Sequence, residues 1–226
     1  MENFNFKGAL FDLDGTLADN YTAIHRCTSA AFEAFGIPAP SYEKLVKTVG
    51  GSILITMKRL LADTEFADMY EKTAELYMRT YSDYVFCGLR AMPFAEDVLK
   101  TLRARGLKLG CFTNKQREGA DAVLRKLGLF GYFDSITATT LHSARKPDAE
   151  FSRAALASLG LSADEVVCVG DSPFDYAAAA NVGAASALVA TGGDSRETLV
   201  QKCPDAIGVF DNLKQLSAAV FGAPLE

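Results

Sequence analysis

Hydrophobic residues in this chain gather in short runs that each end in polar residues. The first run, residues 6–14, leads into Asp-Gly-Thr and predicts a buried strand that feeds a loop. Comparable runs, of which the last is weaker, predict strands at 107–113, 134–140, 165–171, 183–190 and 206–210. Between them, hydrophobic residues recur at helical spacing, as they do from Phe94 to Leu102. Strands that alternate with helices predict a parallel sheet, so the expected fold is doubly wound α/β.

One long segment breaks this alternation. Residues 18–90 contain no convincing strand, and helical spacing predicts helices at 20–35, 41–48, 52–62 and 64–86. We expect a small all-helical cap inserted directly after the first strand. The predicted division is an α/β core, residues 1–17 and 88–226, and a helical cap, residues 18–87.

Two local signals predict where elements begin within the core. Pro147 suits the first turn of a helix that runs to Leu159 and ends before Gly160. Ser162 and Glu165 have the spacing of a capping box, which predicts a short helical turn before the strand at 165–171.

Polar residues follow the predicted strands, and in open parallel sheets ligands bind beyond the carboxyl ends of the strands. These residues are Asp12, Asp14, Gly15, Thr16, Thr113, Asn114, Lys146, Asp171 and Asp175. We therefore expect four carboxylates, a lysine and threonine hydroxyls to gather in one place. Packing requirements alone do not explain such a concentration of polar groups.

Asp12 and Asp14 stand two residues apart, and Leu13 between them is expected to face the core. In an extended segment both carboxylates would point to one side, about 6.5 Å apart at about 3.3 Å per residue. Carboxylates that close repel each other unless a cation intervenes, and Asp171 supplies a third acidic group. Ligands that are all oxygen atoms favour Mg²⁺, which would allow a carboxylate to attack a phosphorus atom.

The remaining polar residues suit phosphate binding. Lys146 stands at a predicted helix entry, where it would hold a phosphate and pair with Asp12. Thr113 and Asn114 offer a hydroxyl group and backbone donors for phosphoryl oxygens. Asp175 either caps a helix or holds a metal-bound water molecule, and we favour the second interpretation.

Composition narrows the partners. The 226 residues carry a net charge of −5 without a run of five basic residues, which argues against nucleic-acid binding. The five cysteines are odd in number and form no CxxC pair, so neither a zinc site nor a disulfide framework is expected. No signal peptide and no apolar run of membrane-spanning length is evident. A cytoplasmic protein that acts on a small phosphorylated metabolite is expected.

Four motifs, taken together, resemble those of the haloacid dehalogenase superfamily. They are FDLDGTLADN, FTNK, RKPD and VGDSPFD, in that order along the chain. The resemblance implies a Rossmann-like core with a mobile helical cap and is nearest to phosphoglycolate phosphatase-like members. It implies that Asp12 is the nucleophile and Asp14 the general acid and base. It also implies Mg²⁺ bound by Asp12, the Asp14 carbonyl and Asp171, with Asp175 acting through water, and phosphate bound by Thr113, Asn114, Lys146 and Gly15.

Several alternatives stay open at this point. Gly170 stands where β-phosphoglucomutase-like enzymes usually carry Glu, so a phosphatase acting on 2-phosphoglycolate or a sugar phosphate is preferred to a mutase. A phosphoaspartate signalling module is a third candidate, against which Asp14 argues. His25 and His142 receive no catalytic role, and Gly50–Gly51 is equally a substrate contact or a simple turn. The oligomeric state, monomer or homodimer, is not predicted.

Overall fold

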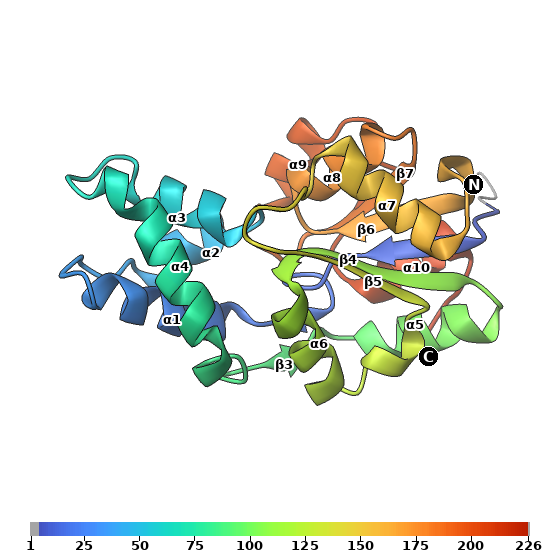
Figure 1. The fold of residues 1–226 in the computed structure, drawn as a ribbon. Coiled ribbons are helices and arrows are strands. Elements are labelled where there is room, and N and C mark those ends of the chain that lie inside the picture. Colours follow the sequence, from blue (N-terminus) through green and yellow to red (C-terminus); the bar gives the residue numbers. More distant parts are fainter. Residues whose placement is uncertain (1–4, 226) are drawn as a thin grey trace.

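Six strands form one parallel sheet at the centre of the molecule. A computed structural model describes residues 5–225 and orders the sheet β5-β4-β1-β6-β7-β8 (Figure 1). The strands are β1 (Gly8–Phe11), β4 (Lys108–Gln116), β5 (Ser135–Thr139), β6 (Val166–Gly170), β7 (Ala185–Val189) and β8 (Val209–Phe210). Every neighbouring pair runs parallel. The predicted doubly wound α/β fold is therefore confirmed, including its weak sixth strand.

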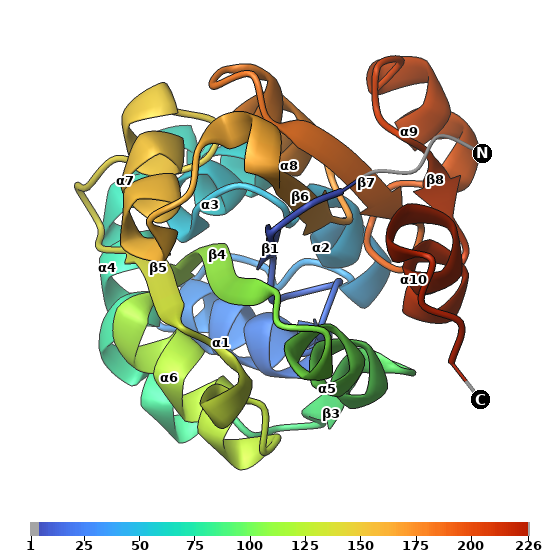
Figure 2. The same cartoon turned by 90° about the vertical axis from the view of Figure 1, so that its right-hand side faces the viewer.

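Helices cover both faces of this sheet (Figure 2). They are α5 (Ala95–Ala104), α6 (Arg117–Lys126), α7 (Ala149–Leu159), α8 (Pro173–Ala180), α9 (Arg196–Lys202) and α10 (Leu213–Phe221). Alternate strand residues point to opposite faces. Phe11 therefore packs in the same cluster as α5, α6 and α10, whereas Leu10 packs with α7 and α8. Strands β1, β6 and β7 are buried on both sides, as expected for the inner strands of a parallel sheet, whereas the edge strand β5 is only partly buried.

Four further helices lie together at one end of the molecule (Figure 1). They are α1 (Tyr21–Glu33), α2 (Tyr42–Thr48), α3 (Ile53–Leu61) and α4 (Tyr70–Thr80). Ser41 and Ser52 cap α2 and α3 with their side chains. Helix α4 packs against α1 and α3 and is shorter than the predicted helix at 64–86, because 3₁₀ turns flank it at Ala67–Met69 and Tyr81–Asp83.

A short antiparallel ribbon corrects the prediction that residues 18–90 contain no strand. Strand β2 (Ala18–Asp19) pairs with β3 (Arg90–Ala91), and Arg90 Nη2 lies 2.8 Å from Asp19 Oδ2. The ribbon joins the two chain connections that run between the sheet and helices α1–α4. Two-residue strands carry no hydrophobic alternation, so no sequence pattern could reveal them.

The segment around Lys146 also differs from its prediction. Helix α7 begins at Ala149 with Asp148 as its N-cap, so Pro147 lies before the helix and not in its first turn. Lys146 accordingly stands in the preceding loop. The capping box of Ser162 and Glu165 is confirmed at the 3₁₀ turn Ala163–Glu165.

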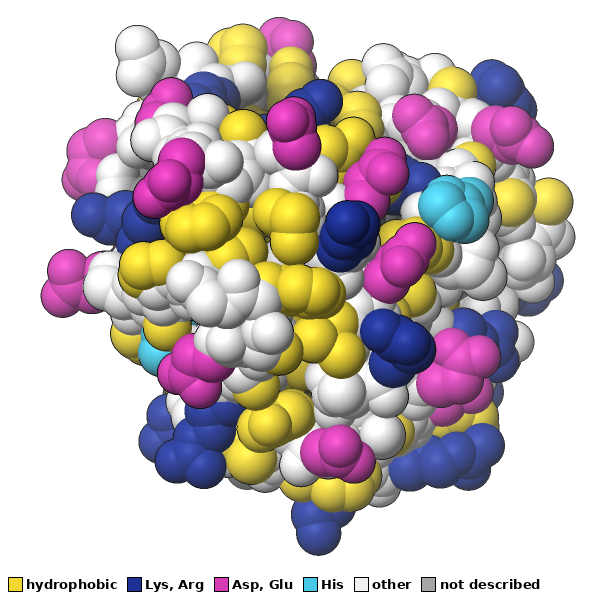
Figure 3. Space-filling view, turned by 60° about the vertical axis from the view of Figure 1, so that its left-hand side comes forward, with side chains coloured by type: hydrophobic (Ala, Val, Ile, Leu, Met, Phe, Trp, Pro, Cys, Tyr) yellow, Lys and Arg dark blue, Asp and Glu magenta, His cyan; other side chains and the backbone are white. Residues whose placement is uncertain are grey.

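The molecular surface mixes side chains of different kinds. On the face in Figure 3, hydrophobic side chains form an uneven band, and Lys or Arg and Asp or Glu side chains alternate around it. None of the helices in the described part of the chain combines the length and apolar character that crossing a bilayer requires.

Candidate active site

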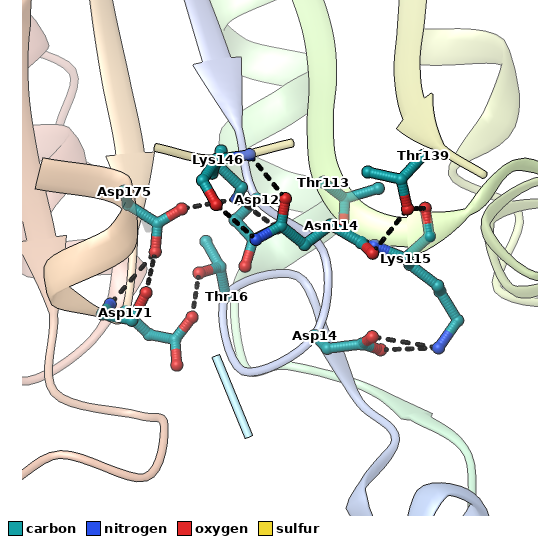
Figure 4. A network of polar contacts seen from close by, with 11 residues as sticks. Asp12, Asp14, Thr16, Thr113, Asn114, Lys115, Thr139, Lys146, Asp171 and Asp175 are labelled. Atoms are coloured by element: carbon teal, nitrogen blue, oxygen red, sulfur yellow. Dashed lines mark hydrogen bonds and ion pairs between the residues drawn. The ribbon is translucent and has the colours of Figure 1, made fainter. Parts of the chain in front are cut away.

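The predicted site residues come together at the carboxyl ends of the three central strands, β4, β1 and β6 (Figure 4). The chain leaves β1 toward β4 on one side and returns as β6 on the other, which creates the crevice where open α/β sheets bind ligands. Asp12 follows β1 directly, and its backbone N–H donates to the carbonyl of Val169 at 2.8 Å. Asp171 follows β6 in the same way.

Lys146 lies at the centre of this group. Its Nζ atom is 2.8 Å from Asp12 Oδ1 and 2.6 Å from Asp175 Oδ1, so the predicted pairing with Asp12 is confirmed. The side chain is only 1% exposed. Burial lowers the pKa of Lys146, but the carboxylates of Asp12 and Asp175 outweigh it and raise that pKa above its ordinary value. The group is therefore an ammonium at neutral pH.

Asp175 caps a helix, one of the two interpretations offered for it, whereas the metal-bound water stays a prediction. Its Oδ1 atom receives the ammonium of Lys146, and its Oδ2 atom accepts hydrogen bonds from the N–H of Ser172 at 3.1 Å and its hydroxyl at 2.6 Å. The latter contacts form the capping box of α8. Helix capping therefore fixes the rotamer that delivers the other oxygen to the site.

Asp171 is a buried acid of this cluster. Thr16, fully buried, donates its hydroxyl to Asp171 Oδ1 at 3.1 Å. Burial, and then the negative charges of Asp175 and Asp12, raise the pKa of Asp171 well above its ordinary value. Glycines leave room around it: a Cβ atom on Gly192 would stand 1.7 Å from Asp171 Oδ2.

The charges of this cluster do not balance. Asp12, Asp171 and Asp175 place ligand oxygens within 4.8 Å of one another, and Lys146 forms ion pairs with Asp12 and Asp175. Three carboxylates and one ammonium leave two negative charges when all are ionised. Among the described residues, Asp12 Oδ1 is also buried without a well-aligned hydrogen bond, although Lys146 Nζ lies near it. An oxygen-only donor set with two surplus charges fits a hard dication such as Mg²⁺.

Asp14 occupies a different environment from Asp12. Strand β1 ends at Phe11 and the chain bends at Leu13, so the prediction that residues 12–14 are extended is wrong. Leu13 is fully buried, as expected. Asp14 forms an ion pair with Lys115, whose Nζ atom lies 2.9 Å from Oδ2 and 3.2 Å from Oδ1. This second pair is neutral and needs no further cation.

Thr113 and Asn114 lie within β4, which extends three residues past its predicted end. Thr113 is buried, and its hydroxyl accepts the N–H of Lys115 at 3.2 Å. The Asn114 carboxamide is committed to Lys146: it accepts that residue's N–H at 2.7 Å and donates to its carbonyl at 3.1 Å. Asn114 thus holds the loop that carries the lysine.

Gly15 makes the turn after Asp14 possible. Its φ angle is +88°, and a Cβ atom there would stand 2.5 Å from Asp171 Oδ2. Its carbonyl accepts a hydrogen bond from Thr191 at 2.6 Å. Any larger residue would be strained and would displace the Asp171 carboxylate.

A pocket opens beside Asp12 and Asp14 and reaches toward α1–α4. Its walls on that side are mostly apolar, formed by Ile24, Val49, Ile53, Leu54, Tyr77 and Met78. Gly50 and Gly51 also line it. Arg145 lies at its rim and donates to Ser52 Oγ, at the start of α3, at 2.9 Å.

Comparison with known proteins decides the family. The model for the haloacid dehalogenase-like hydrolases matches residues 9–189. A phosphoglycolate phosphatase of Yersinia pseudotuberculosis is 32% identical over 205 residues, covering 89% of this chain and 88% of the relative. The chain belongs to the haloacid dehalogenase-like hydrolases. The resemblance drawn from the four motifs is therefore confirmed.

Other relatives agree with this assignment. A protein of Clostridium perfringens that bears a pyrophosphatase name is 29% identical over 201 residues, covering 88% of this chain and 91% of that protein. A crystal structure from Lactobacillus delbrueckii subsp. bulgaricus, which bears a phosphoglycolate phosphatase name, has a TM-score of 0.86 at 24% identity and covers 96% of this chain and 98% of that chain. At that identity the structural likeness shows the fold alone. The prediction of a phosphatase-like hydrolase is confirmed at the level of the enzyme class.

In this hydrolase, sequence reasoning missed Lys115 and Asn20, and it named Thr16 without predicting the hydrogen bond from Thr16 to Asp171. Lys115 stands two residues after Thr113, and its place in an extended β4 was the available signal. Asn20 is the N-cap of α1, yet its side chain makes no capping bond and donates instead to Asp14 Oδ1 at 3.2 Å. His25, given no role, bonds the carbonyl of Pro40 at 2.9 Å, away from the site residues.

Proposed function

We propose that the protein is a Mg²⁺-dependent phosphatase that hydrolyses small phosphate monoesters through a phosphoaspartate on Asp12. The observation that carries the proposal is the placement of Asp12 at 2.8 Å from the Lys146 ammonium, inside a carboxylate cluster with two surplus negative charges. The family membership and the phosphatase names of its relatives support it.

The metal would be held by Asp12 and Asp171, with the Asp14 carbonyl as a further ligand and Asp175 acting through water. When bound, Mg²⁺ would neutralise the surplus charge and so reduce the repulsion between the Asp12 carboxylate and an anionic phosphate. Lys146 and Thr113 would contact the phosphoryl oxygens, together with Asn114 and Gly15 through their backbone.

The proposed reaction has two steps. Asp12 attacks phosphorus, the bond from phosphorus to the ester oxygen breaks, and that oxygen keeps the electron pair and takes a proton from Asp14. Water then attacks the phosphoaspartate while Asp14 accepts its proton. The bond from phosphorus to Asp12 breaks, which releases inorganic phosphate and restores both aspartates.

We further propose a division of the chain into a core, residues 1–17 and 88–226, and a cap, residues 18–87. The ribbon of β2 and β3 lies at both crossings between them and supports this division. The contact from Arg145 to Ser52 ties the two parts together beside the pocket. Closure of the cap would exclude bulk water and favour free metabolites over polymer-linked phosphates.

The substrate class is a small ester such as 2-phosphoglycolate or a sugar phosphate. A relative with a pyrophosphatase name makes pyrophosphate the second candidate. The mostly apolar walls of the pocket toward α1–α4 favour a leaving group that carries less charge than a second phosphate. We place the protein in the cytoplasm; its five cysteines are free thiols, which suits a reducing compartment.

Phosphate release from 4-nitrophenyl phosphate, 2-phosphoglycolate, a sugar phosphate and pyrophosphate, with Mg²⁺ or with EDTA, tests the proposal. Mg²⁺-dependent turnover of at least one monoester is expected, and Asp12→Asn should abolish it. The matched control is Asp121→Asn, which removes a surface carboxylate paired with Arg117 and should leave turnover unchanged. Borohydride reduces acyl phosphates to alcohols, so adding it during turnover should convert phosphorylated Asp12 to homoserine. Activity of Asp12→Asn equal to wild type would refute the nucleophile assignment.

A further inference from the structure

Lys115 makes contacts that differ from those of an ordinary substrate-binding lysine. Its ammonium bonds both oxygens of Asp14, at 2.9 and 3.2 Å, and lies 4.6 Å from the centre of the Tyr81 ring. The side chain is 7% exposed. An ammonium has three N–H donors, and two oxygens and one ring face engage them. Lys115 therefore has little capacity left to bind a phosphate or carboxylate group.

Lys115 and the Tyr81 ring that it contacts come from different parts of the fold. Lys115 belongs to β4 of the sheet, whereas Tyr81 begins the 3₁₀ turn Tyr81–Asp83 that follows α4. Tyr81 is buried, and its ring stacks on Tyr77 at 5.2 Å between centroids. The position of the Tyr81 ring therefore follows the packing of α4.

Asn20 closes this arrangement into a ring of four residues. Its Nδ2 atom donates to the Tyr81 hydroxyl at 2.5 Å and to Asp14 Oδ1 at 3.2 Å. Asn20 is fully buried and immediately follows the ribbon strand β2. Asp14 is thus held by one donor from the sheet and one from the start of α1, and Tyr81 contacts both donors.

The pocket gives this ring access to the substrate. Asp14, Lys115 and Tyr81 all line the same pocket as Asp12. A leaving group seated there would touch the Tyr81 ring on one side and Asp14 on the other. Filling the pocket and positioning the Asp14 carboxylate would therefore be physically linked.

We propose that Lys115 and Tyr81 are positioning residues for Asp14: Tyr81 holds the Lys115 ammonium, which in turn aims the Asp14 carboxyl group, protonated for this step, at the leaving-group oxygen. The inference rests on the proposed function, because it assigns Asp14 the proton transfer. The step it affects is breakage of the bond from phosphorus to the ester oxygen, when that oxygen takes the electron pair and the Asp14 proton. Esters whose leaving group needs no proton should be insensitive to this pair.

The test compares two esters that differ in this need. Nitrophenolate departs from 4-nitrophenyl phosphate without a proton, whereas the alkoxide of glycerol phosphate requires one. For Lys115→Met, kcat on glycerol phosphate should fall by about 100-fold, the usual contribution of a general acid, with KM little changed. On 4-nitrophenyl phosphate kcat should fall by less than about 3-fold. Lys115→Arg, which keeps a cation, should recover much of the loss.

Further variants separate positioning from folding. Tyr81→Leu removes the ring but leaves the ion pair, and we expect a loss of about 10-fold on the alkyl ester alone. It carries the same comparison if Lys115→Met does not fold. The matched control is Lys126→Met, which removes an exposed lysine at the end of α6, 5.6 Å from the centre of the Phe86 ring.

Each outcome has a defined meaning. Equal losses on the two esters would show that Lys115 has a structural role, and unchanged turnover of the alkyl ester would show no role; either result overturns the inference. Wild-type protein that hydrolyses neither ester would instead refute the proposed function. A selective loss on the alkyl ester that Lys115→Arg reverses would support the inference.

Discussion

Replacing Asp12 with asparagine is expected to stabilise the metal-free protein while abolishing its proposed activity. Burial raises the pKa of Asp12 from its ordinary value of 3.8 to about 6, despite the opposing effect of Lys146. At neutral pH Asp12 is therefore ionised in the folded protein at a cost in folding free energy. Asparagine has nearly the same shape and no charge, so it removes this cost.

The magnitude follows from the shift in pKa. A rise from 3.8 to about 6 costs about 3 kcal/mol, at about 1.4 kcal/mol per pH unit. Between those pH values the folded state binds a proton at Asp12 that the unfolded state does not, so wild-type stability falls as pH rises through this window. Above it the cost is fully present, and below it the cost vanishes.

Urea unfolding in EDTA measures this effect. At about pH 7.5 Asp12→Asn should be more stable than wild type by about 2 to 3 kcal/mol, and at about pH 4 the two should agree. Mg²⁺ should reverse the order at the higher pH, because it binds the ionised cluster of the wild type more tightly. The surface variant Asp121→Asn should stay within about 0.5 kcal/mol of wild type. A destabilised Asp12→Asn at the higher pH, or a gain equal at both values, would refute the reasoning.

Three further substitutions test the surroundings of the cluster. Thr16→Val removes the buried hydrogen bond to Asp171, 3.1 Å long, and should cost about 1 to 2 kcal/mol in urea unfolding with Mg²⁺ present. Gly192→Ala would place a Cβ atom 1.7 Å from an Asp171 oxygen, so it should weaken Mg²⁺ binding by at least about 10-fold in calorimetry. The control Gly131→Ala, whose Cβ would meet nothing within 4 Å, should leave Mg²⁺ binding unchanged. Arg145→Met breaks the contact with Ser52, the N-cap of α3, and kcat/KM should fall by about 10-fold, mainly because KM rises. An unchanged KM would contradict the role of that contact.

The fold was predictable because hydrophobic strands alternate with helices of useful length. Elements whose hydrophobic residues enter the main core, such as β6 and α5, left clear patterns. The ribbon of β2 and β3 left none, because two-residue strands depend on tertiary pairing. The end of β4 was misplaced for a related reason: its last residues are polar and belong to the site, so hydrophobicity alone stops too early.

The candidate site was predictable because parallel strands bring their carboxyl ends to one edge. Asp12, Lys146 and Asp171 met there as expected. The hydrogen-bond partners of the site residues could not be predicted in the same way. The bond from Asn114 to the Lys146 backbone joins residues 32 apart, and Lys115 reaches Asp14 across 101 residues. Such pairings depend on rotamers and loop paths, which no residue spacing encodes.

The two halves of the site differ in charge: one has surplus negative charge and the other is neutral, which indicates a different role for each half. Around Asp12 the carboxylates outnumber the lysine, so the cluster would gain stability from a bound dication. Around Asp14 the side-chain ion pair with Lys115 is already neutral and borders the apolar walls of the pocket, so the Asp14 side chain adds no surplus charge that would attract the metal. A phosphate ester would therefore enter in one orientation, with its phosphoryl group toward Asp12 and its leaving group toward Tyr81. In that orientation the bond to be broken lies between the proposed nucleophile and the proposed acid.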